Sequence, residues 1–122
     1  MSNLKQLLDT LGSAPETISF DQVQAVIAAH YDYRPTTFTN GAGDDPVTNR
    51  AGSNEGSCRV FAFALLHQLD PQQTLACFGD FYRQDVLGNP AGEDHANIRR
   101  FMRDGWSGIR FDGVALTKKQ PA

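Results

Sequence analysis

Residues 54–67 read NEGSCRVFAFALLH, and this stretch decides the fold. Its apolar side chains recur at spacings of three and four residues, and one stripe comprises Cys58, Phe61, Ala62, Leu65 and, just beyond, Leu69. Further apolar residues cover most of the remaining helix surface. A helix that is apolar nearly all round lies buried in the middle of a protein. We therefore predict that residues 54–58 begin the central helix of the core.

The polar residues at this helix start have structural explanations. Asn54 or Ser57 can cap the backbone N–H groups that lack partners in the first turn. The carboxylate of Glu55 complements the positive end of the helix dipole, and Gly56 allows an unusual backbone angle. The same N–H groups can alternatively bind an anion, which Glu55 would oppose.

The N-terminal third of the chain predicts two helices. Residues Leu4–Leu11 place leucines on one helical face, and Gly12 stops that helix. Ser19 and Gln22 have the spacing of a capping box, which starts the second helix. That helix has to end before Pro35, because a proline disfavours helical backbone at the residue before it.

The region after the central helix predicts two more helices. Asp70 is an N-cap followed by a proline, and the apolar pattern carries this helix on to Tyr82. Gly79 within it indicates a close approach between helices. The last helix contains Ile98 and ends near Gly105.

Strand signals occur in two places. Thr36–Thr39 is β-branched and aromatic, and Val47–Asn49 is its expected return strand. Alternating apolar residues in Ile109–Leu116 flank Asp112-Gly113, which predicts a hairpin. We predict an α+β fold: one mainly helical domain spanning 1–122 with a small antiparallel sheet. The alternative is an all-α fold with marginal hairpins.

Composition excludes several classes of function. The 122 residues are 40 % hydrophobic and carry a formal charge of −3, which favours a globular domain that binds neither nucleic acid nor membranes. The four clustered arginines, Arg99, Arg100, Arg103 and Arg110, are typical of a solvated helix face. The chain holds two cysteines without a CxxC motif, and it starts without a signal-peptide pattern. Both features favour a reducing cytosol.

One candidate active site involves the cysteine at the helix start. A thiol in the first turn of a helix is stabilised as thiolate by the dipole and by nearby N–H groups. Cys58 could then pair with His95, oriented by Asn97 or Asp94, as in a thiol-dependent hydrolase or acyltransferase. The alternative is that Cys58 is a buried apolar residue of the core, which needs no catalytic role.

The sequence predicts neither a metal site nor a cofactor. Asp94-His95, His67 and Glu93 are potential ligands, but the histidines are at least 28 residues apart and none has the spacing of a zinc motif. No glycine pattern matches a phosphate loop or a dinucleotide fingerprint. His67 fits a hydrogen-bonded residue at the edge of the core.

Six stretches of the sequence are distinctive in combination: Phe38–Gly41, Asn54–Ala64, Thr74–Gly79, Tyr82–Leu87, His95–Arg99 and Gly105–Ile109. On these stretches the chain resembles the HopJ type III effector family, from about residue 15 to Leu116. The resemblance implies no established reaction, so no catalytic residue is carried over. It allows type III delivery into a host cell, which generally uses a flexible N-terminal segment, whereas Leu4–Leu11 predicts an early helix.

Three hypotheses about function follow. The first is a binding or regulatory domain, with Tyr31, Tyr33, Phe38 and Trp106 as anchors for a protein partner. The second is the thiol-dependent enzyme described above. The third is a small-molecule or anion-binding protein with a pocket lined by Asn54, Arg59, Asn97 and Arg99. The second and third require His95–Arg99 to fold back beside Asn54–Cys58.

Overall fold

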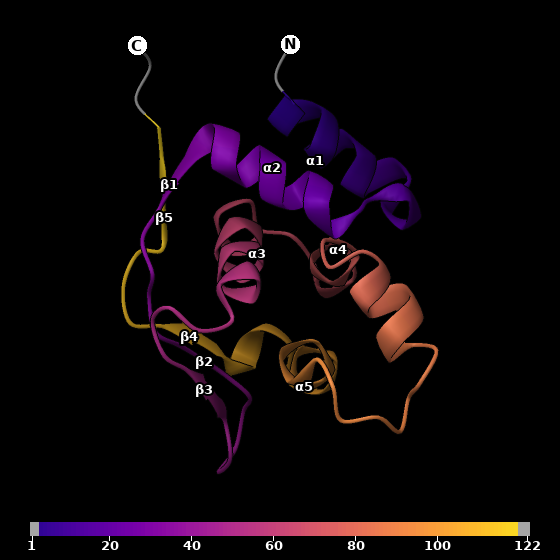
Figure 1. The fold of residues 1–122 in the computed structure, drawn as a ribbon, viewed down its shortest axis with the longest axis vertical. Coiled ribbons are helices and arrows are strands. Elements are labelled where there is room, and N and C mark those ends of the chain that lie inside the picture. The colour runs from indigo at the N-terminus through magenta and orange to yellow at the C-terminus, as the bar shows by residue number, and fades with distance from the viewer. Residues whose placement is uncertain (1–2, 120–122) are drawn as a thin grey trace.

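The computed structural model describes residues 3–119, which form a mainly helical fold with two small antiparallel sheets (Figure 1). The α-helices are α1 (Asn3–Ser13), α2 (Phe20–His30), α3 (Glu55–Leu66), α4 (Pro71–Ala76) and α5 (Ala96–Asp104). The 3-10 turns are η1 (Pro15–Thr17) and η3 (Gly105–Gly108), and η2 (Phe81–Val86) is a π-helix. The strands are β1 (Tyr31–Tyr33), β2 (Phe38–Asn40), β3 (Val47–Asn49), β4 (Ile109–Phe111) and β5 (Leu116–Lys118). The predicted α+β class is confirmed.

Helix α3 lies at the centre of the fold, as its apolar surface predicts (Figure 1). Residues 60–64 are all buried, and so is Cys58. Two leucines near the end of α3 are not buried: Leu65, within the predicted stripe, is 53 % exposed and Leu66 is 52 % exposed, whereas Leu69 just beyond the helix is buried. The helix ends at Leu66 and the chain turns away at Gln68, whose φ is 53°. The fully buried aromatic side chains around α3 are Phe38, Phe61, Phe63, Phe78 and Phe101.

The other helix starts follow from local chemistry. The Ser19 hydroxyl accepts a hydrogen bond from the Gln22 N–H at 3.1 Å, so the predicted capping box forms. Asp70 accepts from the Gln73 N–H at 2.8 Å and caps α4. Each interaction spans only three residues, so the sequence contains all of the information that it needs. No helix within residues 3–119 has both the length and the hydrophobicity to cross a membrane.

The predicted helix from Asp70 to Tyr82 is interrupted. Helix α4 ends at Ala76, and Gly79 adopts a left-handed conformation with φ 60° before η2 begins. A Cβ atom on Gly79 would lie 2.6 Å from the backbone nitrogen of Phe20. The close approach that Gly79 predicts is therefore present, and it brings η2 against the start of α2.

Two of the antiparallel strand pairs share one register. Tyr31 pairs with Lys118 in β1–β5, and Phe38 pairs with Phe111 in β2–β4. These two residue pairs are seven residues apart along both segments of the chain, so the pairing register continues from one sheet to the other without an extra residue on either side.

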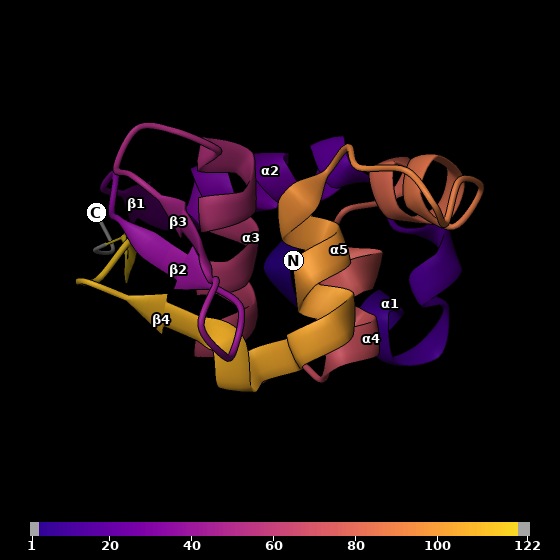
Figure 2. The ribbon, with the colours of Figure 1, turned by 90° about the horizontal axis from the view of Figure 1, so that it is seen from below.

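The predicted hairpin at Asp112-Gly113 is wrong, because β4 and β5 both run along the 31–40 segment instead of pairing with each other. The hairpin of β2 and β3 is confirmed, and it places β3-β2-β4 beside α5 (Figure 2).

Candidate ligand-binding cavity

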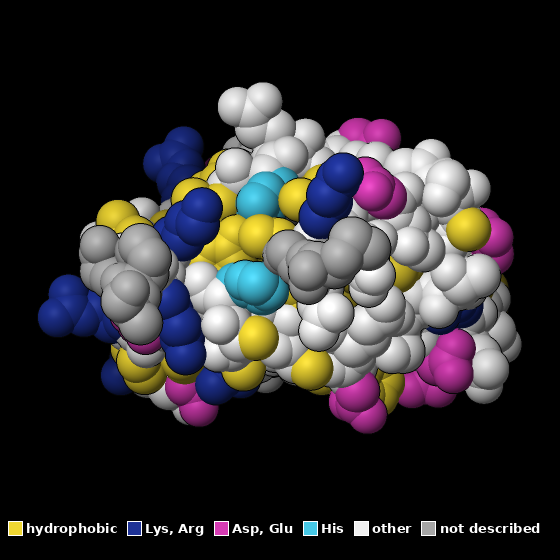
Figure 3. Space-filling view, turned by 90° about the horizontal axis from the view of Figure 1, so that it is seen from above, with side chains coloured by type: hydrophobic (Ala, Val, Ile, Leu, Met, Phe, Trp, Pro, Cys, Tyr) yellow, Lys and Arg dark blue, Asp and Glu magenta, His cyan; other side chains and the backbone are white. Residues whose placement is uncertain are grey.

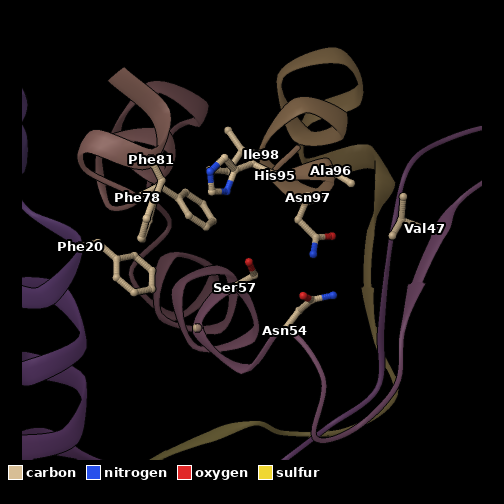
Figure 4. A pocket seen from close by; sticks show the side chains of 11 residues that line it. Phe20, Val47, Asn54, Ser57, Phe78, Phe81, His95, Ala96, Asn97 and Ile98 are labelled. Atoms are coloured by element: carbon tan, nitrogen blue, oxygen red, sulfur yellow. The ribbon is translucent and has the colours of Figure 1, made fainter. Parts of the chain in front are cut away.

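A cavity of about 380 Å³ lies where the N-termini of α3 and α5 approach η2. Figure 4 shows its two kinds of wall. The apolar wall consists of Phe20, Phe78, Phe81 and Ile98, and the polar wall consists of Asn54, Ser57, His95 and Asn97. A volume above roughly 300 Å³ and a few polar groups that converge beside apolar side chains are typical of small-molecule sites.

Two helix N-termini face this cavity without side-chain caps. Asn54 precedes α3 and His95 precedes α5, and both have left-handed backbones, with φ 51° and 52°. Neither side chain accepts a hydrogen bond from the helix that it precedes, so the predicted cap at Asn54 is wrong. Within residues 3–119, the N–H groups of residues 55–57 and 96–98 have no hydrogen-bond acceptor. With this left-handed backbone, the Asn54 side-chain amide hydrogen-bonds to Asn49 instead of to the first turn of α3.

That amide belongs to a network of four asparagines. Asn97 and Asn49 exchange reciprocal amide hydrogen bonds of 2.9 and 3.0 Å. Asn40 donates to the Asn97 backbone carbonyl at 2.8 Å, and Asn54 donates to the Asn49 side-chain carbonyl at 2.6 Å. Asn97 is only 6 % exposed, and Asn40 and Asn49 are buried. The network joins β2 and β3 to the first turn of α5 and the residue before α3, so it sets the shape of the cavity.

The imidazole of His95 is held by the π-helix. Its Nε2 lies 3.0 Å from the Asp85 carboxylate, and its ring centroid lies 5.2 Å from that of Phe81. Phe81 and Asp85 are four residues apart in η2, where wider turns bring such residues close to one face. π-Helical turns are frequent at functional sites. Asp85 and Phe81 were missed as site residues, although Asp85 lies within one of the HopJ-like motifs.

Cys58 does not reach this cavity. It is 1 % exposed, and its thiol donates to the Thr36 carbonyl at 3.6 Å. Successive helical residues point about 100° apart, so Ser57 faces the cavity while Cys58 faces the core. Burial raises the pKa of the Cys58 thiol, mainly because it disfavours the thiolate. The structure therefore does not bring Cys58 together with His95 as nucleophile and base.

We expect both cysteines to react at least about 100-fold more slowly with a colorimetric thiol reagent in the native protein than in urea near neutral pH. Burial raises the pKa of Cys77 to about 12 and also raises that of Cys58. The measurement is the rate of thiol labelling in wild type and in the variants Cys58→Ser and Cys77→Ser. Fast native labelling that disappears in Cys58→Ser would restore Cys58 as a nucleophile.

The two arginines predicted to line the pocket lie elsewhere. The Arg59 guanidinium stacks 4.2 Å from the centroid of the Tyr33 ring. Arg99 donates to the Asp94 carboxylate at 2.6 Å and to the Asn89 carbonyl at 3.0 Å, which fastens the connector before α5. This ion pair lowers the pKa of Asp94. Of the predicted binding residues, only Asn54 lines the cavity, together with Asn97.

His67 and the predicted aromatic anchors have structural partners. His67 Nε2 lies 2.5 Å from the Tyr31 hydroxyl, and burial followed by nearby Lys118 lowers the His67 pKa. Histidine and hydrophobic side chains adjoin on the face seen in Figure 3. Phe38 is in the core, and the Trp106 indole donates to the Leu69 carbonyl at 3.0 Å. Residues 3–119 contain no cluster of three or more metal-ligating His, Cys, Asp or Glu side chains.

The HopJ type III effector protein family matches residues 4–116 of this sequence. The chain belongs to the HopJ type III effector family. A similar solved structure, the crystal structure of an unknown-function protein named VPA0580, has 53 % sequence identity and a TM-score of 0.90. The similarity covers 95 % of this chain and 93 % of that one. Among curated proteins, none matches the sequence.

The two most distinctive HopJ-like motifs meet at the cavity. The start of Asn54–Ala64 forms one side of it, and the start of His95–Arg99 forms the other. They are linked through Asn49, which accepts hydrogen bonds from both Asn54 and Asn97. The first residues of two of the HopJ-like stretches thus lie at the cavity.

Proposed function

We propose that this HopJ domain binds a small organic molecule in the cavity between α3, α5 and η2. The observation that carries the proposal is the cavity itself, in which unpaired N–H groups, the Ser57 hydroxyl and the His95 imidazole face a wall of phenylalanines. Such a combination provides both apolar contact area and a few orienting hydrogen bonds. The family description associates the domain with type III effectors, so binding can take place in the bacterial cytoplasm or, after delivery, in a host cell.

Binding is favoured over catalysis by the arrangement of the nucleophilic side chains. Cys58 is buried away from the cavity. The Ser57 hydroxyl points into the cavity, but no hydrogen bond joins it to His95 in the described part of the chain. A serine without a bonded general base is a weak nucleophile. The hydroxyl is better suited to donate a hydrogen bond to a ligand.

Filling the cavity tests the proposal. Ala96 is exposed at the first position of α5 and lines the cavity, so Ala96→Leu places a larger side chain in it without disturbing the core. Ala28→Leu is the matched control, because Ala28 is exposed on α2 and does not line the cavity. The measurement is a fragment-library screen by amide NMR shifts, followed over residues 55–57 and 96–98.

We expect fragments to shift these amides in wild type and in Ala28→Leu, and to bind at least about tenfold more weakly to Ala96→Leu. Thermal unfolding of both variants shows whether each remains folded. A library that leaves these amides unmoved in wild type, or that binds Ala96→Leu as tightly as wild type, would rule out the cavity as the binding site.

A further inference from the structure

We infer that the cavity takes a small organic anion: a phosphate or carboxylate group joined to an aromatic ring. This inference rests on the proposed function and adds the chemical class of the ligand. The anionic group lies between the starts of α3 and α5, and the ring lies against Phe20, Phe78 and Phe81. The cavity has separate polar and apolar walls, and a ligand of this class complements both of them.

The polar wall favours negative charge. The dipoles of α3 and α5 both end at the cavity, and these helices have 12 and 9 residues. Their first-turn N–H groups are hydrogen-bond donors without acceptors in residues 3–119. The Ser57 hydroxyl points toward the same space in Figure 4, where Asn97 faces it from the opposite helix. Such N–H and O–H groups can donate hydrogen bonds to an anion but not to a cation.

The residues that line the cavity include neither Asp nor Glu within the described chain, and the nearby carboxylates have partners of their own. Glu55, which the sequence suggested would oppose an anion, lies instead near the Tyr33 hydroxyl and contributes, after burial, to its raised pKa. Asp85 is the nearest charged group on η2, and it faces the Nε2 atom of His95. Asp94 is engaged by Arg99 at 2.6 Å and lies 3.9 Å from His95.

The apolar wall favours a ligand that carries an aromatic group over an inorganic ion. Phe81 is 41 % exposed, although its ring contacts Phe20 edge-on with centroids 5.1 Å apart. Phe20 also stacks on Phe78, with centroids 6.4 Å apart. An inorganic phosphate would leave the exposed part of the Phe81 ring in water, whereas an aromatic group on the ligand would cover it and add ring–ring contacts.

Four probes separate the contributions of charge and ring: phenyl phosphate, benzoate, benzyl alcohol and inorganic phosphate. Binding to the intact protein is followed by amide NMR shifts of residues 55–57 and 96–98. We expect phenyl phosphate or benzoate to bind about tenfold more tightly than benzyl alcohol and than inorganic phosphate, because each of the latter engages only one wall. The stronger of the two organic anions identifies the preferred head group.

Phe81→Ala tests the position of the ring. It is expected to weaken binding of the preferred organic anion about fivefold and to leave inorganic phosphate unchanged. The control is Leu87→Ala, since Leu87 is similarly exposed just after η2 and does not line the cavity. Benzyl alcohol binding as tightly as the anions, or equal binding of the anion to Phe81→Ala and wild type, would overturn the inference while leaving a ligand-binding cavity. Failure of every probe and every library fragment would overturn the proposed function itself.

Discussion

Replacing Asn97 with alanine is expected to lower the free energy of unfolding by about 3 kcal/mol, because buried amide groups lose their partners. The Asn49 amide nitrogen would lose its 3.0 Å bond and keep only contacts of 3.5 Å to the Phe38 and Val47 carbonyls. Asn40 would keep its bond to the backbone carbonyl of residue 97 and lose the one to the side chain. The first turn of α5 would also lose its side-chain hydrogen bonds to Asn49 of β3.

Urea unfolding of wild type and Asn97→Ala measures this loss. The matched control is Asn89→Ala, because the exposed Asn89 side chain makes no hydrogen bond in residues 3–119 and only its backbone N–H and carbonyl groups do. The control is expected to stay within about 0.5 kcal/mol of wild type. A loss below about 1 kcal/mol in Asn97→Ala would mean that the asparagine network does not hold the two helix starts in place.

The second large effect is expected at Gly79, where alanine should cost about 3 to 4 kcal/mol. Its φ of 60° accounts for roughly 1 to 2 kcal/mol, because a Cβ atom disfavours left-handed backbone. The remainder comes from the new Cβ atom, which would lie 2.6 Å from the Phe20 nitrogen and 3.2 Å from the Ser19 carbonyl carbon. These are backbone atoms, so the start of α2 would have to shift.

Two other glycines separate the contributions of backbone angle and crowding. Gly52 has φ 91° and open space where a Cβ atom would lie, so Gly52→Ala reports the cost of the backbone angle alone. Gly12 lies in α1 with open space and no positive φ, so Gly12→Ala is expected to be neutral or to stabilise by up to about 1 kcal/mol. Equal losses in Gly79→Ala and Gly52→Ala, measured by urea unfolding, would show that crowding at α2 contributes nothing.

Local signals in the sequence predicted the elements whose partners are close along the chain. The Ser19–Gln22 capping box is an example, because the two residues that make it are three apart. Residues 112–113 show where such reasoning fails. Their Asp-Gly turn signal is real, but the Asp112 N–H donates to Thr37, and the flanking strands extend an antiparallel pairing with residues 31–40. Pairing with a distant strand replaced the hairpin that the turn favours locally.

At the candidate site too, the sequence predicted some residues and missed those that depend on distant partners. The sequence selected Asn54, His95 and Asn97, and all three line the cavity. It gave no reason to select Asn40 or Asn49, which lie 57 and 48 residues before Asn97. It offered Cys58 as a candidate nucleophile, with burial in the core as the alternative, and it offered Ser57 only as a helix cap. The direction of each side chain depends on how α3 is rotated against the core, and a composition that is apolar nearly all round leaves that rotation open.

The sequence by itself determined the central helix, the capped helix starts, the α+β class and the family, because each follows from periodicity, short-range hydrogen bonding or distinctive motifs. Only the tertiary structure decided that Asn54–Ser57 and His95–Asn97 share a cavity, that Ser57 rather than Cys58 faces it, and that Asp85 holds His95. These features depend on the burial of amide groups between segments far apart in the chain and on a π-helical turn, neither of which leaves a local signature in the residue pattern.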